Sequence, residues 1–471
     1  MSQELKPDLC VIGAGSGGLS VAAAAAAMGV SVVLVEKGQM GGDCLNYGCV
    51  PSKALIAAAR VAHTMRHAGR FGIDSVEPRV DGAKVHAHIH DVIKSIAPND
   101  SQARFEAMNV KVIRAPGKFV SARVLEAGDF SIRARRFVVA TGSAPSAPPI
   151  PGIELVRYLT NESIFDLTRL PARLVIIGAG PIGIELAQAF RRLGSEVVVI
   201  EAGRALGRED PELAAVALNA LAGEGVELRE GVAIERIEPL PAGVRVLLAG
   251  GGSVEGTDLL VAAGRTPNVG GLGLEAAGVN FDRKGVHVDR GLRTSNRRIY
   301  AVGDVAGMAQ FTHAANYHAG LVLRSALFRL SAKVDETLIP RVTYCDPEIA
   351  VAGLSEADAR AKHGSVNVLR WPFSENDRAH ASQETAGHIK LVTAPDGTIL
   401  GVGIVGPHAG ELIGLWQLAL SKRMKFGDIA RIVLPYPTLS EVSKRAAILG
   451  YADKLRSPWL GRILRFMRRF G

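Results

Sequence analysis

LCVIGAGSGG, residues 9–18, is the stretch that decides the fold of this 471-residue chain. Its first four residues are apolar and predict a buried parallel strand, and the glycines after them predict a turn into a helix. Gly13 permits the tight turn, Gly15 lets a pyrophosphate approach the backbone, and Gly18 lets the helix pack closely on the strand. The N-terminus of such a helix points free N–H groups and the positive end of its dipole at phosphates.

The next predicted strand supports a dinucleotide site. Val32–Val35 is apolar throughout, and Glu36 stands directly after it, where a carboxylate accepts hydrogen bonds from a ribose. A glycine-rich turn alone is a weak signal. A strand, turn, helix, strand and terminal acid in this order make a strong one.

The same pattern occurs a second time. Residues 174–177 and 197–200 predict two strands, and the second strand ends in Glu201. The glycines of the turn between them are Gly178, Gly180 and Gly183. This duplication predicts two bound dinucleotides. Because Glu201 would repel a 2′-phosphate, we expect NADH rather than NADPH at the second site, while Arg204 nearby leaves a contact to a 2′-phosphate open.

Residues 41–53, GGDCLNYGCVPSK, lie just beyond the first unit and hold two of the chain's four cysteines. Cys44 and Cys49 are five positions apart, so one helical turn can bring their sulfurs within disulfide reach. We expect one helix from about Cys44 through Arg60, with Lys53 one turn beyond Cys49 on the same face. A close pair in a cysteine-poor chain indicates redox chemistry, the alternative being a chance pair of buried thiols.

The composition, with 48% hydrophobic residues, 53 glycines and 23 prolines, is typical of a turn-rich α/β protein of about three domains. The net charge is +9, but six Lys and Arg residues follow Asp453 without any acid, so most of the basicity belongs to a tail. We therefore expect no nucleic-acid partner. No secretory signal precedes the first strand, and the apolar run 21–28 is too short to span a membrane, which predicts a cytoplasmic protein.

The tail has an amphipathic pattern if residues 459–470 form a helix. One side would hold Trp459, Leu460, Ile463, Leu464, Phe466, Met467 and Phe470, and the other Arg462, Arg465, Arg468 and Arg469. Such a helix predicts peripheral contact with a membrane surface, here the inner face of the cell membrane. Packing on its own dimer or on a partner protein is the alternative.

Residues 80–110 predict partly amphipathic helices that carry His86, His88 and His90. No cysteine or acid completes a ligand set with these histidines, so we expect a solvated helix face and no metal site. Between residues 110 and 139, alternating polarity predicts a small antiparallel sheet.

Residues 41–53 resemble the redox-active segment of the FAD-dependent pyridine nucleotide-disulfide oxidoreductases, which include dihydrolipoamide dehydrogenase, glutathione reductase and mercuric reductase. The resemblance extends from Asp8 to about Lys444. It implies an α/β fold with two Rossmann-like dinucleotide-binding domains and a C-terminal α+β dimerisation domain, which builds a homodimer with composite active sites. The implied domains are an FAD-binding domain in two parts (1–146 and 266–337), an NAD(P)-binding domain (147–265), a dimerisation domain (338–456) and a basic amphipathic tail (457–471).

The resemblance also implies FAD at the first glycine turn and NAD(P)H at the second. It assigns to Asp304 a hydrogen bond with the ribityl chain of the flavin. The other residues expected at the cofactors are Gly42, Thr141, Gly142, Gly264, Arg265 and Gly303.

In the implied reaction, electrons pass from NADH through the flavin to the Cys44–Cys49 disulfide. Cys49 would lie against the flavin as a thiolate, and Cys44 would meet the substrate. Lys53 would help to stabilise the anion, paired with Glu185, which follows the second glycine turn by two residues. The alternative for Glu185 is an exposed acid on a helix.

One position departs from the pattern of the disulfide reductases in this family. They carry a histidine before a Pro-Thr pair near the C-terminus, where this chain has Tyr436, followed by the expected Glu441. Histidine titrates near ~6.5 and tyrosine near ~10, so tyrosine is a poor base at neutral pH. Losing this proton transfer is expected to slow ordinary dithiol exchange by roughly 10²–10⁴-fold.

A tyrosine at this position is similar to mercuric reductases, but their C-terminal cysteine pair is missing, since no cysteine follows Cys345. We therefore expect a mercuric-reductase-like flavoprotein that reduces a small disulfide, an electrophile or a quinone-like acceptor. Dihydrolipoamide dehydrogenase and a true mercuric reductase are the alternatives. Two other classes stay open: a membrane-docked redox-responsive adaptor, and carbon chemistry on a thiol-linked substrate, as in one histidine-lacking branch of the family.

Overall fold

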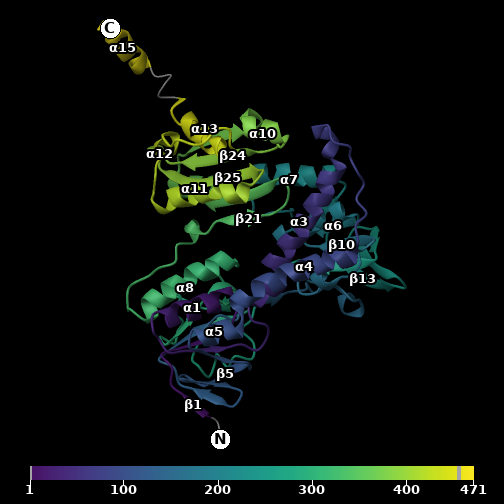
Figure 1. Ribbon diagram of the computed structural model, residues 1–471, viewed down its shortest axis with the longest axis vertical. Coiled ribbons are helices and arrows are strands. Elements are labelled where there is room, and N and C mark those ends of the chain that lie inside the picture. The colour runs from purple at the N-terminus through teal and green to yellow at the C-terminus, as the bar shows by residue number, and fades with distance from the viewer. Residues whose placement is uncertain (1–2, 453–457, 471) are drawn as a thin grey trace.

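The computed structural model describes residues 3–452 and 458–470 (Figure 1). The first nucleotide unit is a five-stranded parallel sheet in the order β20-β8-β2-β3-β4. Its strands are β2 (Leu9–Ile12), β3 (Val32–Val35), β4 (Val110–Ile113), β8 (Arg136–Val139) and β20 (Ile299–Ala301). Helices α1 (Ser16–Ala27) and α8 (Thr312–Ala326) cover one face, and the strands β5 to β7 cover the other. Burial on both faces explains why the central strands are apolar throughout.

The predicted antiparallel sheet between residues 110 and 139 is only partly correct. Strands β5 (Gly117–Ser121), β6 (Val124–Ala127) and β7 (Phe130–Ile132) are antiparallel to one another, with β1 (Gln3–Leu5) parallel to β7. The flanking strands β4 and β8 instead pair in parallel with β3 and β2. Short apolar runs carry no information about the partner strand, so the sequence pattern merged two sheets into one.

The second unit repeats this plan with a four-stranded parallel sheet in the order β12-β11-β10-β16. Its strands are β10 (Arg173–Ile177), β11 (Glu196–Glu201), β12 (Glu227–Glu230) and β16 (Asp258–Val261). Helices α6 (Pro181–Leu193) and α7 (Pro211–Gly223) pack on one face, and the antiparallel strands β13 (Ile234–Leu240), β14 (Gly243–Leu248) and β15 (Ser253–Gly256) pack on the other. Helices α3 (Cys49–Arg66) and α4 (Gly82–Ile96) share the core of α6, so the cysteine segment joins the two units (Figure 1).

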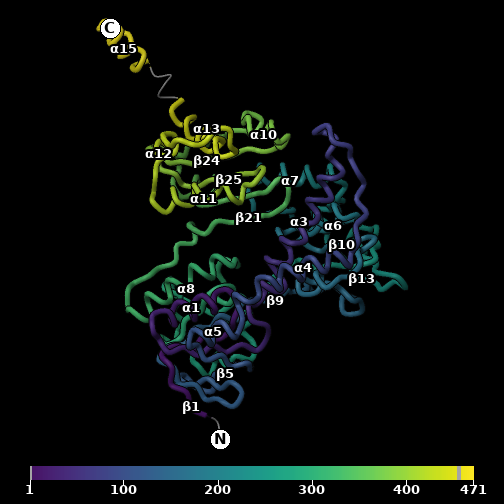
Figure 2. The backbone as a smooth tube through the Cα atoms, viewed as in Figure 1, coloured from purple at the N-terminus to yellow at the C-terminus, as the bar shows by residue number. Residues whose placement is uncertain are grey.

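The third unit is a five-stranded antiparallel sheet in the order β21-β22-β25-β24-β23. Its strands are β21 (Arg341–Thr343), β22 (Glu348–Gly353), β23 (Asn367–Pro372), β24 (His388–Thr393) and β25 (Ile399–Gly406). Figure 2 shows the chain running from α8 to β21. Helices α11 (Ala409–Ser421) and α13 (Glu441–Leu449) complete its core. The expected α/β fold, with two Rossmann-like units and a C-terminal α+β unit, is confirmed.

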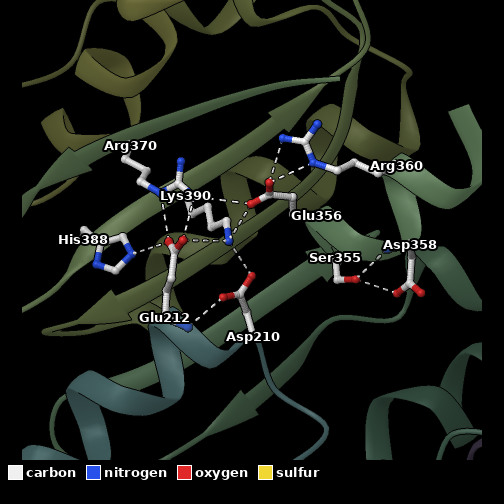
Figure 3. A network of polar contacts seen from close by, with 9 residues as sticks. All are labelled: Asp210, Glu212, Ser355, Glu356, Asp358, Arg360, Arg370, His388 and Lys390. Atoms are coloured by element: carbon white, nitrogen blue, oxygen red, sulfur yellow. Dashed lines mark hydrogen bonds and ion pairs between the residues drawn. The ribbon is translucent and has the colours of Figure 1, made fainter. Parts of the chain in front are cut away.

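An ion-pair network connects the second unit to the third (Figure 3). Lys390 of β24 is buried, and its Nζ lies 2.8 Å from Asp210, 2.9 Å from Glu356 and 3.5 Å from Glu212. Arg370 of β23 donates two hydrogen bonds to Glu212, at 2.8 and 2.7 Å. Because Asp210 and Glu212 belong to the start of α7, the network joins the sheet of the third unit to a helix of the second.

The C-terminal helix is α15 (Pro458–Met467), so the predicted helix at residues 459–470 ends three residues early. None of its side chains is buried. The predicted domain boundary between residues 456 and 457 lies outside the described residues. Among the helices that the structure describes, none combines the length and the apolar composition needed to cross a bilayer.

Candidate active site

A cavity of about 1580 Å³ is lined by residues of all three units. Both glycine turns, both cysteines of the 41–53 segment and Tyr344 of the third unit contribute to its walls. Parallel sheets bind nucleotides at the carboxyl ends of their strands, and both glycine turns follow such ends. The fold therefore brings the two predicted dinucleotide sites and the cysteine pair to one cavity.

The first glycine turn has the geometry that its residue types predict. Gly13 has φ = 106°, and a Cβ on Gly18 would overlap the carbonyl oxygen of Gly13. Glu36 accepts hydrogen bonds from the N–H groups of Ala14 and Gly38, both at 2.5 Å. Gly42 packs on the Cα of Gly15, so the cysteine segment begins directly against the turn.

The second glycine turn repeats these contacts almost one for one. Gly178 has φ = 104°, and a Cβ on Gly183 would overlap the carbonyl oxygen of Gly178. Glu201 accepts hydrogen bonds from the N–H groups of Ala179 at 2.8 Å and Gly203 at 2.9 Å. Beside Gly180 no atom lies where its Cβ would be, which leaves the backbone open to a ligand.

The other residues that we expect at the cofactors also meet at the cavity. Its walls include Thr141, Gly142, Gly264, Arg265, Gly303 and Asp304. Ser143 donates a 2.5 Å hydrogen bond to Asp304, and Arg265 in turn donates to Ser143 at 2.8 Å. Burial raises the pKa of the Asp304 carboxyl above its ordinary value. An open glycine turn, an acid at the ribose position and a half-buried carboxylate in one cavity of this size fit FAD.

The cysteine segment is two helices and not the single helix predicted from Cys44 through Arg60. α2 (Gly42–Asn46) ends before α3 begins at Cys49. Pro51 has no N–H to donate to the carbonyl of Tyr47, so the helical ladder cannot continue across this point. That carbonyl instead accepts a hydrogen bond of 3.2 Å from Asn161, which also donates to Asp43 at 3.0 Å. Asn161 thus holds the turn that carries Cys44.

Both cysteine thiols are free, and each changes the pKa of the other. The influence of Cys44 is the main reason why the pKa of Cys49 is lowered, to about 6, and the influence of Cys49 is the main reason why the pKa of Cys44 is raised. Thr312, at the first turn of α8, lies 3.5 Å from the Cys49 sulfur, and together with Lys53 it contributes to the lowering of this pKa. The surroundings therefore favour the thiolate form of Cys49 and the protonated form of Cys44.

Lys53 and Glu185 form an ion pair with an Nζ–Oε2 distance of 2.8 Å. Glu185 is buried, with 6% of its surface exposed, which excludes the alternative of an exposed helix acid. Its other oxygen accepts the N–H of Tyr344 at 2.9 Å, and the Lys53 ammonium lies 4.3 Å from the centre of the Tyr344 ring. Lys53 therefore sits between a carboxylate and an aromatic face.

Sequence reasoning missed Thr312, Tyr344 and Asn161. Thr312 lies 263 residues beyond Cys49, and Asn161 lies 118 residues beyond Asp43. No local pattern indicates such contacts. For Thr312 the one available signal was its place at the start of a helix, where N–H groups favour an anion.

Tyr436 and Glu441 lie apart from the cysteines of the same chain. Neither is among the described residues that line the cavity. Tyr436 is 70% exposed and donates a 2.6 Å hydrogen bond to Asp377, which raises the pKa of the tyrosine. Glu441 opens α13.

Comparison with known families assigns nearly the whole chain. Residues 7–319 match the pyridine nucleotide-disulphide oxidoreductases, and residues 339–447 match the dimerisation domain of the same enzymes, which supports a homodimer. A mercuric reductase from Lysinibacillus sphaericus is 35% identical over 447 residues, covering 94% of this chain and 82% of that protein. A dihydrolipoyl dehydrogenase from Thermus scotoductus is 38% identical over 455 residues, covering 93% and 96%.

Solved structures agree with this assignment. LpdA from Mycobacterium tuberculosis has a TM-score of 0.87 and 27% identity, covering 93% of this chain and 98% of that chain. The HOCl-induced flavoprotein disulfide reductase RclA from Escherichia coli has a TM-score of 0.84 and 26% identity, covering 94% and 99%. The fold, the paired glycine turns and these relatives lead to one conclusion: the chain belongs to the pyridine nucleotide-disulphide oxidoreductases, a family of FAD-dependent NAD(P)H enzymes.

Proposed function

We propose that this enzyme passes electrons from NADH, through FAD, to the Cys44–Cys49 pair and from there to a small-molecule oxidant. The observation that carries the proposal is the position of Cys44 and Cys49 on the wall of the cavity that both glycine turns also line. Thr312 lies 3.5 Å from the Cys49 sulfur, and the surroundings lower the pKa of Cys49 and raise that of Cys44. Bound FAD supplies hydride acceptance from the nicotinamide and delivery of two electrons to the disulfide. The chain's own residues position these groups and hold the charges.

In this mechanism two electrons break the Cys44–Cys49 bond, and one proton goes to Cys44. Cys49 stays a thiolate at neutral pH, stabilised by the hydrogen bonds from Cys44 and Thr312 and by the ammonium of Lys53. Cys44 must later lose its proton to attack the oxidant. Tyr436 of the partner subunit would stand where other members of the family have a histidine base, and an exposed tyrosine hydrogen-bonded to Asp377 is a poor base.

The acceptor we propose is therefore one that needs little base assistance, such as a small reactive disulfide, an electrophile or a quinone-like compound. A mercuric ion ranks second, because relatives named mercuric reductase are 33–35% identical, while this chain has no cysteine after Cys345. A copper(II) complex of RclA is also among the similar structures, which adds Cu²⁺ to the acceptors worth testing. Lipoamide, the disulfide that corresponds to the dihydrolipoamide dehydrogenase alternative, ranks third.

Anaerobic titration of the holoenzyme with NADH tests the electron path. We expect two-electron reduction with a long-wavelength absorbance band from a thiolate beside the flavin, followed by fast reoxidation with one of the oxidants above. Tyr436→His should gain activity with lipoamide or glutathione disulfide. Reduction without turnover by any oxidant would instead support the redox-responsive adaptor, and a band that persists when Cys49 is replaced by serine would exclude Cys49 as the thiolate.

We propose NADH as the reductant. Glu201 is fixed by two backbone N–H groups at the end of β11, where it would accept hydrogen bonds from an unmodified ribose and repel a 2′-phosphate. Arg204 also lines the cavity, so the choice is tested by comparing kcat/KM for NADH and NADPH in the wild type and in Glu201→Ala. The variant should lose NADH preference, and an unchanged ratio would mean that Glu201 does not select the nucleotide.

We also propose that α15 docks on an anionic membrane surface. Its apolar residues are exposed, with Trp459 at 68% and Met467 at 58%, and its basic residues would face acidic headgroups. Each such charge adds about 1 kcal/mol near an anionic leaflet. Pelleting with phosphatidylserine vesicles should be lost in a chain truncated after Ser457 and reduced in Arg462→Gln/Arg465→Gln. Equal pelleting of truncated and full-length chains would contradict membrane docking.

A further inference from the structure

Three side chains that the proposed reaction does not use meet on the side of α4. His86 and His90 are one helical turn apart, and the fold places Asp166, from the short helix η4 (Ile164–Asp166), against them. One ligand atom of each residue lies within 4.8 Å of the other two, and His90 Nε2 is 3.7 Å from an Asp166 oxygen. The sequence had offered these histidines no acid, because Asp166 is distant along the chain. The tertiary contact thus supplies an acid that no neighbouring residue offers.

We propose that His86, His90 and Asp166 bind one divalent transition-metal ion of the Zn²⁺ class. Two histidines at i and i+4 on one helix face direct both imidazoles to the same point. Imidazole nitrogen with one carboxylate oxygen is a donor set suited to Zn²⁺, and three protein ligands leave a fourth position for water. The three ligand atoms would have to move closer to one another by about 1 Å for all of them to form ~2.0–2.2 Å bonds to one ion.

The His90 ring gives a second, independent indication. Its Nε2 is buried and has no hydrogen-bond partner among the described residues, although the side chain as a whole is 42% exposed. A buried polar atom without a partner costs free energy, and an ion at this point would remove that cost. The two imidazoles already lie together, with ring centres 4.1 Å apart.

Packing holds both sides of the proposed site. Ile89, between the two histidines, is 3% exposed, and Ile164 and Phe165, directly before Asp166, are 1% and 5% exposed. The ligands are thus carried by elements anchored in one core. A simple His90–Asp166 ion pair on this partly exposed surface would contribute little stability, so it does not by itself explain the cluster.

The proposed site is structural and not catalytic. None of its three residues lines the large cavity, but Asn161 and Phe165 of the same segment do. Asn161 holds the Cys44 turn through Asp43 and Tyr47. A bound ion would fix this segment to α4.

Titration of the oxidised, tag-free holoenzyme with Co²⁺, a spectroscopic substitute for Zn²⁺, tests the proposal. The disulfide form keeps Cys44 and Cys49 from binding the ion. We expect one Co²⁺ per chain with the visible bands of a tetrahedral site, and more than about tenfold weaker binding in His86→Gln and in Asp166→Asn. The matched control is His88→Gln, an exposed histidine on the same helix, which should bind as the wild type does.

Two further measurements keep the result decisive. Thermal unfolding in EDTA should be the same for the wild type and for a folded variant, while added Zn²⁺ should raise the midpoint of the wild type alone. Electron paramagnetic resonance of Cu²⁺ added to the wild type should show coupling to imidazole nitrogen. The proposal is overturned if the wild type binds no ion, if His86→Gln binds as tightly as His88→Gln, or if the Cu²⁺ spectrum shows no nitrogen ligand.

Discussion

Lys53 and Lys390 are both ammonium groups that one unit presents to the carboxylates of another part of the fold, yet their surroundings differ. Lys390 has three carboxylates within 3.5 Å, and 5% of its side chain is exposed. Lys53 has one carboxylate partner, Glu185, and 36% of its side chain is exposed, on the wall of the cavity.

Neighbouring carboxylates neutralise the charge of Lys390 more completely than that of Lys53. This difference indicates a structural role for Lys390 and a functional role for Lys53. Three carboxylates surround Lys390, and two of them also pair with arginines, so the charges neutralise one another locally and the group joins two units. Lys53 keeps part of its field, because one carboxylate and an aromatic face do not surround it, and that field reaches the sulfur of Cys49. Burial alone would not have distinguished the two roles.

Replacing Cys49, whose thiolate Lys53 stabilises, should have the largest effect on turnover. Cys49→Ser is expected to lower oxidant turnover at least about 1,000-fold and to abolish the long-wavelength band of the reduced holoenzyme, because no thiolate remains. Steady-state kinetics and anaerobic spectra measure both. Cys345→Ala, which replaces a buried thiol away from the reaction, is the control and should retain turnover. Comparable activity in Cys49→Ser would show that turnover does not need the thiolate of Cys49, and it would contradict the functional role of Lys53.

Lys390→Met tests the structural role of Lys390. Asp210, Glu212 and Glu356 would lose their shared cation at the contact between two units, which should cost about 3 kcal/mol of unfolding free energy. Chemical unfolding measures the loss, and turnover per folded molecule should stay unchanged. Lys362→Met, at an exposed position of α9 (Glu356–His363), is the control, with an expected change within about 0.5 kcal/mol. A loss of turnover without a loss of stability would contradict the structural role of Lys390.

Lys53→Met should have a smaller effect, on the pKa of Cys49. The pKa of Cys49 is about 6, below its ordinary value, so the thiolate is present above about pH 6 and is lost as the pH falls through this value. Without the ammonium of Lys53 this pKa should rise, and the thiolate band at pH 6 should weaken by roughly two- to tenfold. A pH titration of the reduced holoenzyme measures this. Thr312→Val should shift the band in the same direction, while Lys390→Met should not move it.

The smallest expected effect concerns acid stability of the interface between units. The hydrogen bond from Arg370 lowers the pKa of Glu212 to about 2 from its ordinary value of 4.5. The stability that this shift contributes is therefore complete above about pH 4.5 and is lost as the pH falls toward 2. Glu212 is partly exposed and the effect is screened, so the wild type should show only a slightly steeper fall of its thermal midpoint than Arg370→Met. Parallel curves would show that this pair adds no pH dependence.

The sequence was informative wherever function depends on residues close together in the chain. Both glycine turns, with Glu36 and Glu201 after them, follow a local strand–turn–helix order, and the structure repeats the same hydrogen bonds at each. It was less informative at residues 41–60, where the helix pattern concealed the break caused by Pro51. The sequence also did not indicate that β4 and β8 pair in the parallel sheet and not with the antiparallel strands between them.

By itself, then, the amino-acid order determined two nucleotide units and a cysteine pair between them, because each of these depends on residues that are neighbours in the chain. Only the tertiary structure decided that Thr312 meets Cys49, that Asp166 meets His86 and His90, and that Lys390 joins two units. These contacts connect residues far apart in the sequence. They depend on how buried surfaces pack and how charges are neutralised across the whole molecule, which no local periodicity records.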